Sequence, residues 1–509
     1  MLPLTSSLYL KANYLLTSGI QQHTTFLQHK ASHYSLILHI KKMAETKAKT
    51  TLIFVPLPVL SHLLASIKLA NLLTDRDDRL SITILILNLQ LDSKISSRIK
   101  NSQNSRVHFV QLERDESDKS PKSTLVQIVS SQKSAVKSAA AAAAAGSNLS
   151  GFIFDILCSS MMDVAAELGA PSYIFFTCGA AGLGLLFRIS DLIRRRDRAL
   201  KDYLDSDAEV PAPTFVNPVP AKVWPAMAFA NEAGFLDLTD RLRSVSGIVV
   251  NTFLELEAHA IAALAGDAAA PAVYPVGPLL HDEEESADDA ARLRRAEILG
   301  WLDEQPESSV AFLCFGTNGY FDEAQVTEIA TALERSGTRF LWSLRKPPSK
   351  ETGAAISEYE NPGKVLPGGF LDRTAGTGRV IGWAPQMAVL SHRAVGGFMT
   401  HCGWNSILES VSCGVPMAVW PMFAEQQMNA FQLVHELEIA VEIKMDYRRD
   451  APKLVAADRI EKGIRELMDV DNKIHANVKE LKEKSKNALM ENESSSNFVR
   501  SFIENVTNL

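Results

Sequence analysis

Short apolar runs alternate with longer amphipathic stretches along most of the chain, and this alternation limits the possible fold more than any other feature. Runs rich in Ile, Val and Phe lie in the first half at 52–55, 82–87, 107–112, 151–156, 173–176 and 247–250. They recur in the second half at 310–315, 339–344, 379–381, 397–399 and 417–420. Runs of this length between helical patterns are typical of strands in parallel sheets buried on both faces. The sequence therefore predicts an α/β protein with two facing Rossmann-like, doubly wound domains and a cleft between them.

Changes in composition divide the 509 residues into parts. Residues 1–42 contain no Asp or Glu and precede a second methionine, so we expect a weakly ordered leader there. A transit peptide is the alternative, although the segment has no Arg and no clear amphipathic period. The remaining predicted parts are a first domain (43–255), an inter-domain linker (256–295) that ends in an acidic and then a basic block, and a second domain (296–485).

The overall composition is that of a soluble globular protein. Charged residues make up 22% and hydrophobic residues 46% of the chain, and the net charge is −7, which argues against a nucleic-acid-coating protein. No stretch reaches the roughly 18 to 20 apolar residues that a membrane span needs. The cysteines show no C-x-x-C spacing, and they are Cys158, Cys178, Cys314, Cys402 and Cys413. We expect buried thiols in a reducing compartment, the cytoplasm.

The strongest local signal is the segment 400–406, which joins a predicted strand to a predicted helix at 407–413. Asn405 or Ser406 could cap this helix, and Ser406 and Glu409 have the spacing of a capping box, so a purely structural role is one interpretation. The other interpretation is a phosphate site. A turn containing Gly403 at the carboxyl end of a strand exposes free amides at the positive end of a helix dipole.

Residues 383–426 resemble the sugar-donor signature of the plant UDP-dependent glycosyltransferases of secondary metabolism, family 1. The matching residues are Trp383, Gln386, His401, Gly403, Trp404, Asn405, Ser406, Glu409, Pro416, Glu425 and Gln426. The resemblance extends over nearly all of 50–500. It implies a GT-B type fold in which the first domain binds the acceptor, the second binds the UDP-sugar, and a last helix at 486–509 crosses back to the first domain.

The resemblance implies a role for each signature residue near the nucleoside. Trp383 would offer its flat face to uracil, in a turn shared with Ala384. Gln386 would hydrogen-bond the edge of the base or the ribose. Glu409 would accept hydrogen bonds from the ribose hydroxyl groups.

Other matching residues are expected near the diphosphate. His401, Asn405 and Ser406 would hold it together with the helix amides that begin at Gly403. Thr317 lies in the turn 316–319, where the family usually has Ser, and its hydroxyl would meet the β-phosphate. A simple turn without a ligand is the alternative for that segment.

The last signature residues indicate the sugar. Glu425 and Gln426 would bind the sugar hydroxyl groups, and Gln426 together with Trp404 resembles the glucose-preferring version of the signature. The implied activity is an inverting, UDP-glucose-dependent O-glucosyltransferase. Its product would be the β-glucoside of a small apolar phenol or alcohol, such as a flavonoid, another phenylpropanoid or a terpenoid.

The reaction needs a base that titrates near neutral pH, because the acceptor hydroxyl loses its proton. His62 follows the first predicted strand and matches the family's catalytic histidine. Asp155 ends the fourth predicted strand, where a carboxylate after an apolar run needs a partner, and it matches the aspartate that orients the histidine. Asp163 is a weaker candidate because it falls within a helical pattern.

One departure affects the loop before His62. The family usually has two glycines there, and this chain has Val59 and Ser61. Side chains at these positions could narrow the pocket or displace the histidine. The alternative function is therefore a catalytically impaired protein that binds a UDP-sugar or small molecule.

No metal and no cofactor are expected beyond UDP-glucose as co-substrate. Asp205 and Asp207 have the acidic spacing of metal-dependent glycosyltransferases, but they lie in a polar loop far from any strand end. Apart from UDP-glucose and its acceptor, no partner is implied, and we expect a monomer.

Overall fold

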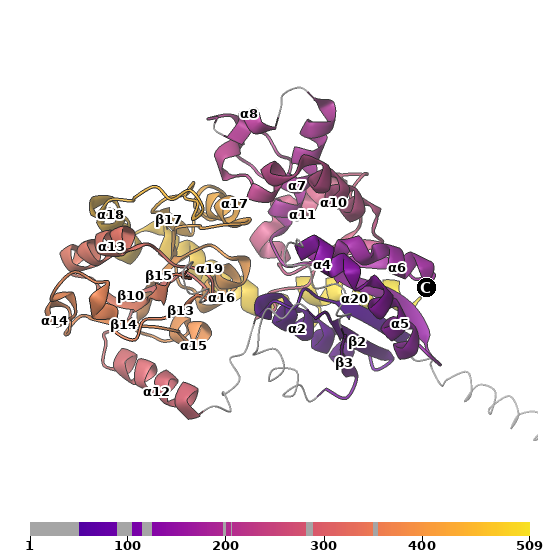
Figure 1. Ribbon diagram of the computed structural model, residues 1–509, viewed down its shortest axis with the longest axis horizontal. Helices are drawn as coiled ribbons and strands as arrows, with labels where there is room; N and C mark the ends of the chain where they lie inside the picture. Colours follow the sequence, from indigo (N-terminus) through magenta and orange to yellow (C-terminus); the bar gives the residue numbers. More distant parts are fainter. Residues whose placement is uncertain are drawn as a thin grey trace, which may run out of the picture. The chain divides into compact units, whose positions relative to one another are not determined.

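The computed structural model contains two large sheets with helices around them (Figure 1). It describes residues 50–88, 104–113, 125–196, 200–204, 206–280, 289–349 and 355–508. The predicted leader at 1–42 lies outside these residues. The described residues from Thr51 onward belong to one compact unit that includes both sheets.

The first sheet has seven strands in the order β3-β2-β1-β4-β5-β8-β9. They are β1 (Thr50–Val55), β2 (Leu80–Ile86), β3 (Val107–Gln111), β4 (Asn148–Asp155), β5 (Ser172–Phe176), β8 (Gly247–Val250) and β9 (Val273–Pro275). Its main helices are α2 (Leu60–Arg76), α4 (Leu125–Ser131), α5 (Lys133–Ala143), α6 (Met162–Glu167), α7 (Ala180–Arg195), α10 (Glu232–Ser244) and α11 (Leu254–Gly266). Each pairing whose register is described is parallel.

The second sheet has six strands in the order β14-β11-β10-β15-β16-β17, all paired in parallel. They are β10 (Val310–Cys314), β11 (Arg339–Ser343), β14 (Gly378–Ile381), β15 (Val395–Thr400), β16 (Met417–Val419) and β17 (Ala440–Glu442). The helices of this half are α12 (Asp289–Asp303), α13 (Glu323–Ser336), α14 (Phe370–Arg373), α15 (Gln386–Leu390), α16 (Trp404–Cys413), α17 (Gln426–Phe431), α18 (Ala457–Met468) and α19 (Lys473–Ala488).

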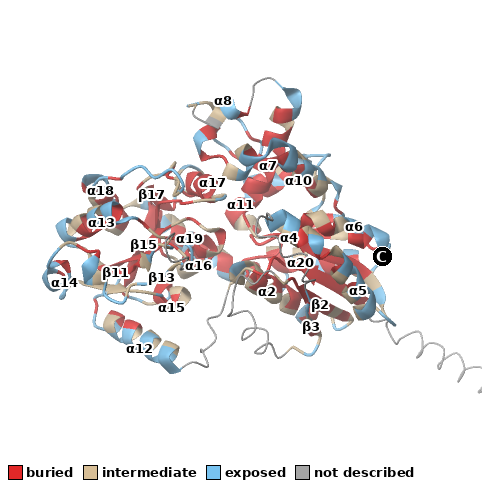
Figure 2. Ribbon diagram, viewed as in Figure 1, coloured by how far each residue is buried: buried red, intermediate tan, exposed pale blue. Residues whose placement is uncertain are grey.

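The strands are continuous apolar runs in the sequence because both of their faces are buried. Every residue of β1, β10 and β15 is buried, and Figure 2 shows most strand residues in red while the outer faces of many helices are exposed. Strands covered on both faces read as continuous apolar runs rather than alternating ones. The predicted α/β class with two doubly wound sheets follows from this pattern.

Both sheets change winding direction at one point. In the first sheet the chain runs outward from β1 to β3 on one side and from β4 to β9 on the other. In the second sheet it runs from β10 to β14 and from β15 to β17. Ligands of open α/β sheets bind outside the carboxyl ends of the strands at such a switch point. The loops after β1 and β4, and those after β10 and β15, are therefore where a site is expected.

The predicted linker at 256–295 differs from the structure. Strand β9 pairs with β8 through Ile248 and Val273, so the first sheet continues to Pro275. Helix α11 occupies 254–266, and α12 begins at Asp289, while residues 281–288 lie outside the described part. A three-residue edge strand between prolines gives no apolar run, which is why the composition indicated a linker.

The last helix, α20 (Ser494–Thr507), packs against the first sheet. The ring of Phe502 lies 5.2 Å, between centroids, from each of the rings of Tyr173 and Tyr274. The hydroxyl of Ser495 donates to the carbonyl of Gly277 at 2.7 Å. The apolar face of this helix is buried in the core around β1 and β2. Helix α20 therefore packs on the first sheet, although the whole second sheet lies between the two in the sequence.

Among the described residues, no helix has both the length and the apolar character required to cross a membrane.

Candidate active site

The first switch point joins His62 to Asp155. His62 lies in the first turn of α2, just after β1, and Asp155 is the last residue of β4, the neighbouring strand. The distance between His62 Nδ1 and Asp155 Oδ2 is 2.6 Å. The other carboxylate oxygen accepts the backbone N–H of Leu157 at 2.9 Å. With Nδ1 occupied by the carboxylate, the free electron pair of a neutral His62 ring lies on Nε2.

The surroundings of His62 tune its acidity. Burial lowers its pKa, but the negative charge of Asp155, the hydrogen bond to it and the charge of Glu425 raise it, and the balance leaves the pKa above its ordinary value. Asp155 has a side chain that is 1% exposed, against 26% for His62. The pair is thus a buried carboxylate beneath a histidine that solvent or a substrate can still reach. This arrangement suits a general base.

The loop before His62 does not require glycine. Val59 has φ −102° and ψ 135°, extended angles that any L-residue adopts, and it precedes the first residue of α2. Ser61 is helical and exposed. The side chains that replace the family's glycines therefore impose no backbone strain, and His62 still reaches Asp155.

The second switch point has a helix N-terminus without a side-chain cap. Helix α16 begins at Trp404, and its N-cap residue is Gly403. The predicted cap at Asn405 or Ser406 and the predicted start at 407 are therefore wrong, because the helix starts earlier and both residues lie inside it. The orphan amides of the first turn remain available to an anion.

The residues of the expected capping box have another partner. The side-chain nitrogen of Gln386 lies 2.8 Å from Ser406 Oγ and 2.6 Å from Glu409 Oε2. Both Ser406 and Glu409 are 7% exposed. The glutamine that follows β14 is thus tied to α16, and these three signature residues form one cluster.

Two buried polar atoms beside the N-terminus of α16 have no hydrogen-bond partner among the described residues: His401 Nδ1 and Asn405 Oδ1. Burial lowers the pKa of His401 to about 4, so its ring is neutral near pH 7. Buried polar groups are almost always paired in folded proteins. Unpaired ones at a helix N-terminus therefore point to a ligand that this structure does not include.

The turn after β10 approaches the same histidine. Gly316 has φ +74°, and a Cβ placed on it would lie 2.6 Å from His401 Nε2. Only glycine allows both this angle and this approach. Thr317, the next residue, is exposed in the turn. The loops after β10 and β15 are therefore in contact, and Thr317 is an exposed residue of the first of them.

The outer signature residues lie at the ends of neighbouring strands. Trp383 follows β14 and is 43% exposed, large for an apolar side chain, while Ala384 beside it is buried. Glu425 follows β16, and burial raises its pKa, although its backbone contacts and His62 lower it. Gln426 begins α17, and its side-chain oxygen accepts the backbone N–H of Met422 at 2.9 Å.

These positions run in one direction along the carboxyl edge of the second sheet. The turn with Trp383 and Gln386 follows the edge strand β14, and Thr317 follows β10 two strands further. His401 follows β15, and Glu425 follows β16. An aromatic face, a polar helix N-terminus and a carboxylate thus succeed one another, in the order that the family resemblance implies for a nucleobase, a diphosphate and a sugar.

Trp404 differs from the expected sugar contact. Its side chain is 2% exposed, and its indole N–H donates to the backbone carbonyl of Asn251, at the end of β8, at 2.7 Å. The side chain therefore links the two sheets. The main chain of Trp404 belongs to the first turn of α16, whose amides have no side-chain cap.

Sequence reasoning missed Arg449. Its guanidinium lies 4.8 Å from the centre of the Tyr320 ring and 4.6 Å from that of Phe423, and it donates to the carbonyl of Asn318. Arg449 thereby ties the turn that contains Thr317 to the loop before Glu425. No motif or spacing in the sequence marks it, because the contact joins segments more than a hundred residues apart.

The weaker acidic candidates lie elsewhere. Asp163 is in the first turn of α6 and pairs with Lys133 on the surface at 2.5 Å. Asp205 lies outside the described residues. Within the ranges that the structure describes, no group of three or more His, Cys, Asp or Glu side chains is placed to hold a metal ion.

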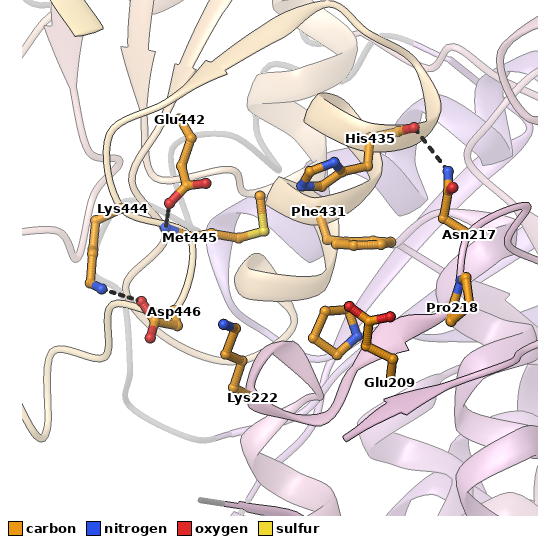
Figure 3. A pocket seen from close by; sticks show the side chains of 11 residues that line it. Glu209, Asn217, Pro218, Lys222, Phe431, His435, Glu442, Lys444, Met445 and Asp446 are labelled. Atoms are coloured by element: carbon orange, nitrogen blue, oxygen red, sulfur yellow. Dashed lines mark hydrogen bonds and ion pairs between the residues drawn. The ribbon is translucent and has the colours of Figure 1, made fainter. Parts of the chain in front are cut away.

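A pocket of about 370 Å³ is lined by none of the signature residues (Figure 3). It is bounded by Glu209 and Pro220 of the hairpin formed by β6 (Glu209–Val210) and β7 (Val219–Pro220), by Lys222, and by Lys444 and Asp446 after β17. The last two form an ion pair at 2.6 Å. Because neither His62 nor the α16 N-terminus lines this pocket, its size does not make it the candidate active site.

A histidine–carboxylate pair at one switch point and a helix N-terminus open to an anion at the other are features that a group-transfer enzyme with an anionic donor requires. Residues 294–453 match the family model described as UDP-glucoronosyl and UDP-glucosyl transferase. UDP-glucose flavonoid 3-O-glucosyltransferase 6 of Fragaria ananassa is 45% identical over 476 residues, 90% of this chain and 99% of that protein. UDP-glycosyltransferase 71E1 of Stevia rebaudiana is 47% identical, over 90% of this chain and 98% of that protein.

Solved structures of UDP-glycosyltransferases are also similar to this chain. A UGT from Siraitia grosvenorii in complex with UDP has a TM-score of 0.82 and 42% identity, covering 90% of this chain and 100% of that one. A UGT from Medicago truncatula complexed with UDP-glucose has a TM-score of 0.79 and 38% identity, covering 90% and 98%. The chain belongs to the UDP-glycosyltransferase family. The predicted family, the predicted enzyme class and the α/β fold with two facing Rossmann-like halves are confirmed.

Proposed function

We propose that this UDP-glycosyltransferase transfers glucose from UDP-glucose to a hydroxyl group of a flavonoid or a related small apolar phenol or alcohol. The observation that carries the proposal is the His62–Asp155 pair at 2.6 Å, on a strand pair at the first switch point. The names of the similar proteins, which include a flavonoid 3-O-glucosyltransferase, support the acceptor class.

Proton transfer is the task of the first half. His62 Nε2 takes the proton of the acceptor hydroxyl while its oxygen attacks the anomeric carbon. Asp155 stabilises the imidazolium that forms and keeps the ring oriented. The new bond joins the acceptor oxygen to the anomeric carbon as the bond from that carbon to the phosphate oxygen breaks. A single displacement of this kind inverts the anomeric carbon, so an α-linked donor gives a β-glucoside.

The second half holds the leaving UDP. Trp383 stacks on uracil, and the cluster of Gln386, Ser406 and Glu409 binds the ribose. The diphosphate lies at the N-terminus of α16. There the His401 ring can donate from Nδ1, which has no partner among the described residues, and the Asn405 side chain can donate through its amide nitrogen. Preorganised donors of this kind stabilise a leaving group's developing charge. We therefore expect the reaction to need no metal ion.

Sugar recognition falls to the loop after β16. Glu425 accepts hydrogen bonds from sugar hydroxyl groups, and Gln426 donates through its amide, whose oxygen is held by the N–H of Met422. One chain supplies both switch points, so we expect a monomer to be active. All cysteines are free thiols, which fits a reducing compartment such as the cytoplasm.

The test is UDP release from the full chain with UDP-glucose and a panel of flavonoids, phenylpropanoids and terpenoid alcohols. UDP-galactose serves as the matched alternative donor, and a chelator is added in a parallel series. We expect turnover with UDP-glucose that survives the chelator, and a β-linked product by the proton coupling at the anomeric carbon. Binding of UDP without turnover on any acceptor would instead support the impaired binding protein.

A further inference from the structure

Glu257 is a buried carboxylate that the proposed mechanism does not use. It lies in α11 and is 3% exposed. Its oxygens accept three hydrogen bonds: from the backbone N–H of Ala180 at 2.8 Å, from that of Ala181 at 2.9 Å, and from the side-chain nitrogen of Gln432 at 2.8 Å. The first two donors belong to the first half of the molecule, and Gln432 belongs to the second.

Local structure is arranged around this carboxylate. Glu257 leaves helical geometry, with φ −129° and ψ 39°, inside α11. Helix α7 has Gly179 as N-cap, without a side-chain cap of its own, so Glu257 supplies both acceptors and a negative charge at its N-terminus. A Cβ on Gly179 would lie 2.7 Å from Glu257 Oε1 and 2.6 Å from the ring of Trp404. The contact therefore requires glycine at this position.

The hydrogen-bond donors to Glu257 lie in segments that continue to the two halves of the active site. On one side, α7 follows Thr177, whose hydroxyl lies 3.5 Å from His62 Nδ1. On the other side, Gln432 directly follows α17, the helix that begins with Gln426. One carboxylate thus connects the segment beside the base with the helix that carries a sugar-binding residue.

We propose that Glu257, acting through Gln432, is a positioning residue that fixes the donor sugar relative to His62. The inference rests on the proposed glucosyl transfer and concerns how its two partners are aligned. Displacement requires the acceptor oxygen within about 3 to 3.5 Å of the anomeric carbon, and a shift of about 1 Å can cost ~100-fold in rate. A charge-assisted hydrogen bond is short and directional. The bond from Gln432 to Glu257 therefore holds the sugar-binding helix in line with His62, although neither residue touches a substrate.

The decisive variant is Gln432→Met. It keeps the volume of the side chain but removes the donor to Glu257, which still caps α7 through Ala180 and Ala181. Gln325→Met is the matched control. Gln325 is also buried, at 2% exposed, and bonds the backbone of Val455 at both ends of its amide, within the second half alone.

A second pair of variants tests the carboxylate itself. Glu257→Gln replaces one accepting oxygen by an NH2 group. That group would face one of the N–H donors that the carboxylate now accepts, so this donor would lose its acceptor. Glu436→Gln is its control, because Glu436 accepts the N–H groups of Val216 and Asn217 across the same interface but at the exposed rim. If Glu257→Gln fails to fold, Gln432→Met still decides the question.

The readouts are UDP affinity by calorimetry, glucosyl transfer to the acceptor, and hydrolysis of UDP-glucose without acceptor. For Gln432→Met we expect transfer to fall ~10- to 100-fold, UDP affinity to stay within about twofold, and the ratio of hydrolysis to transfer to rise. Water is small and mobile, so its attack depends little on the alignment. Gln325→Met should lower the melting temperature without changing that ratio.

Two results would overturn the inference. One is wild-type transfer and an unchanged ratio in Gln432→Met. The other is an equal change in Gln325→Met, which would assign the effect to lost stability alone. Absence of transfer in the wild-type protein would contradict the proposed function instead, so the two failures are distinguishable.

Discussion

The two switch points differ in what they contain before a substrate arrives. At the first, the polar groups are already paired: His62 and Asp155 are 2.6 Å apart, and the remaining carboxylate oxygen accepts a backbone N–H. At the second, His401 Nδ1 and Asn405 Oδ1 are buried without a partner among the described residues, and α16 has no side-chain cap. The same sheet topology thus supports a preorganised base in one half and an incomplete, ligand-dependent site in the other.

Because of this difference, burying polar groups has a different effect on folding stability at the two sites. A paired dyad costs little to keep, because its hydrogen bonds offset the burial of the carboxylate. The unpaired His401 Nδ1 destabilises the ligand-free protein until a diphosphate oxygen accepts its N–H. Substitutions at the first point should therefore affect rate, and substitutions at the second should affect donor affinity and stability.

The largest effect is expected for Asp155→Asn. Loss of the carboxylate removes the charge that stabilises the imidazolium, so kcat/KM should fall ~100-fold or more. The pH profile should also move. In the wild type the raised pKa of His62 makes activity fall as the pH drops through a value above 6.5, since the base must be neutral. Without Asp155 this midpoint should lie at lower pH. A profile that stays in place would contradict the pairing.

A smaller effect is expected for Asn405→Ala. The substitution removes the side-chain amide, whose nitrogen we expect to donate to the diphosphate, and a hydrogen bond to a charged partner contributes about 1.5 to 3 kcal/mol. UDP affinity measured by calorimetry should therefore weaken ~10- to 100-fold. The melting temperature of the ligand-free protein should stay the same or rise, because the buried Asn405 Oδ1, which has no partner among the described residues, is lost. A large drop in melting temperature would show that Asn405 is structural.

The next effect is a dependence of stability on pH. The pKa of His401 is about 4 in the folded protein, below its ordinary value of 6.5. Between these values the unfolded chain binds more protons, so stability is lost as the pH falls from about 6.5 to about 4. In His401→Asn the decline of melting temperature over this range should be shallower. UDP should also flatten it in the wild type, because a diphosphate favours the protonated ring. If the melting temperature declined equally with falling pH in the wild type, in His401→Asn and in the wild type with UDP, the burial of His401 would be contradicted.

The smallest effect is expected from restoring the glycines before His62. Val59 and Ser61 have backbone angles that suit any residue, so Val59→Gly combined with Ser61→Gly should leave kcat/KM within about twofold. A gain of tenfold or more in an acceptor assay would show that these side chains impair the enzyme and would weaken the distinction between a complete and an incomplete switch point.

The sequence was sufficient for the two-sheet fold because its strands are continuous apolar runs, as in β1 and β10. It was not sufficient for β9, a short edge strand between prolines, which appeared as part of a linker. His62 and Asp155 could be paired only through the family resemblance, since ninety-three residues separate them. The start of α16 was misplaced because Asn405 and Ser406 are good caps in isolation, yet Gly403 holds that position.

Contacts between distant segments were beyond any pattern in the sequence. Trp404 matches a donor signature but buries its indole against Asn251. Glu257 and Gln432 meet across 175 residues, and each is unremarkable within its own helix. Such residues are recognised only when the packing of the two halves is known.

The most direct test measures UDP affinity and glucosyl transfer side by side in His62→Ala. We expect the dissociation constant for UDP to stay within about twofold of the wild type, because the second switch point is untouched. Transfer should fall ~100- to 10,000-fold, since the base is gone. Transfer that survives the substitution, or affinity that falls together with transfer, would contradict the separation of base and donor site.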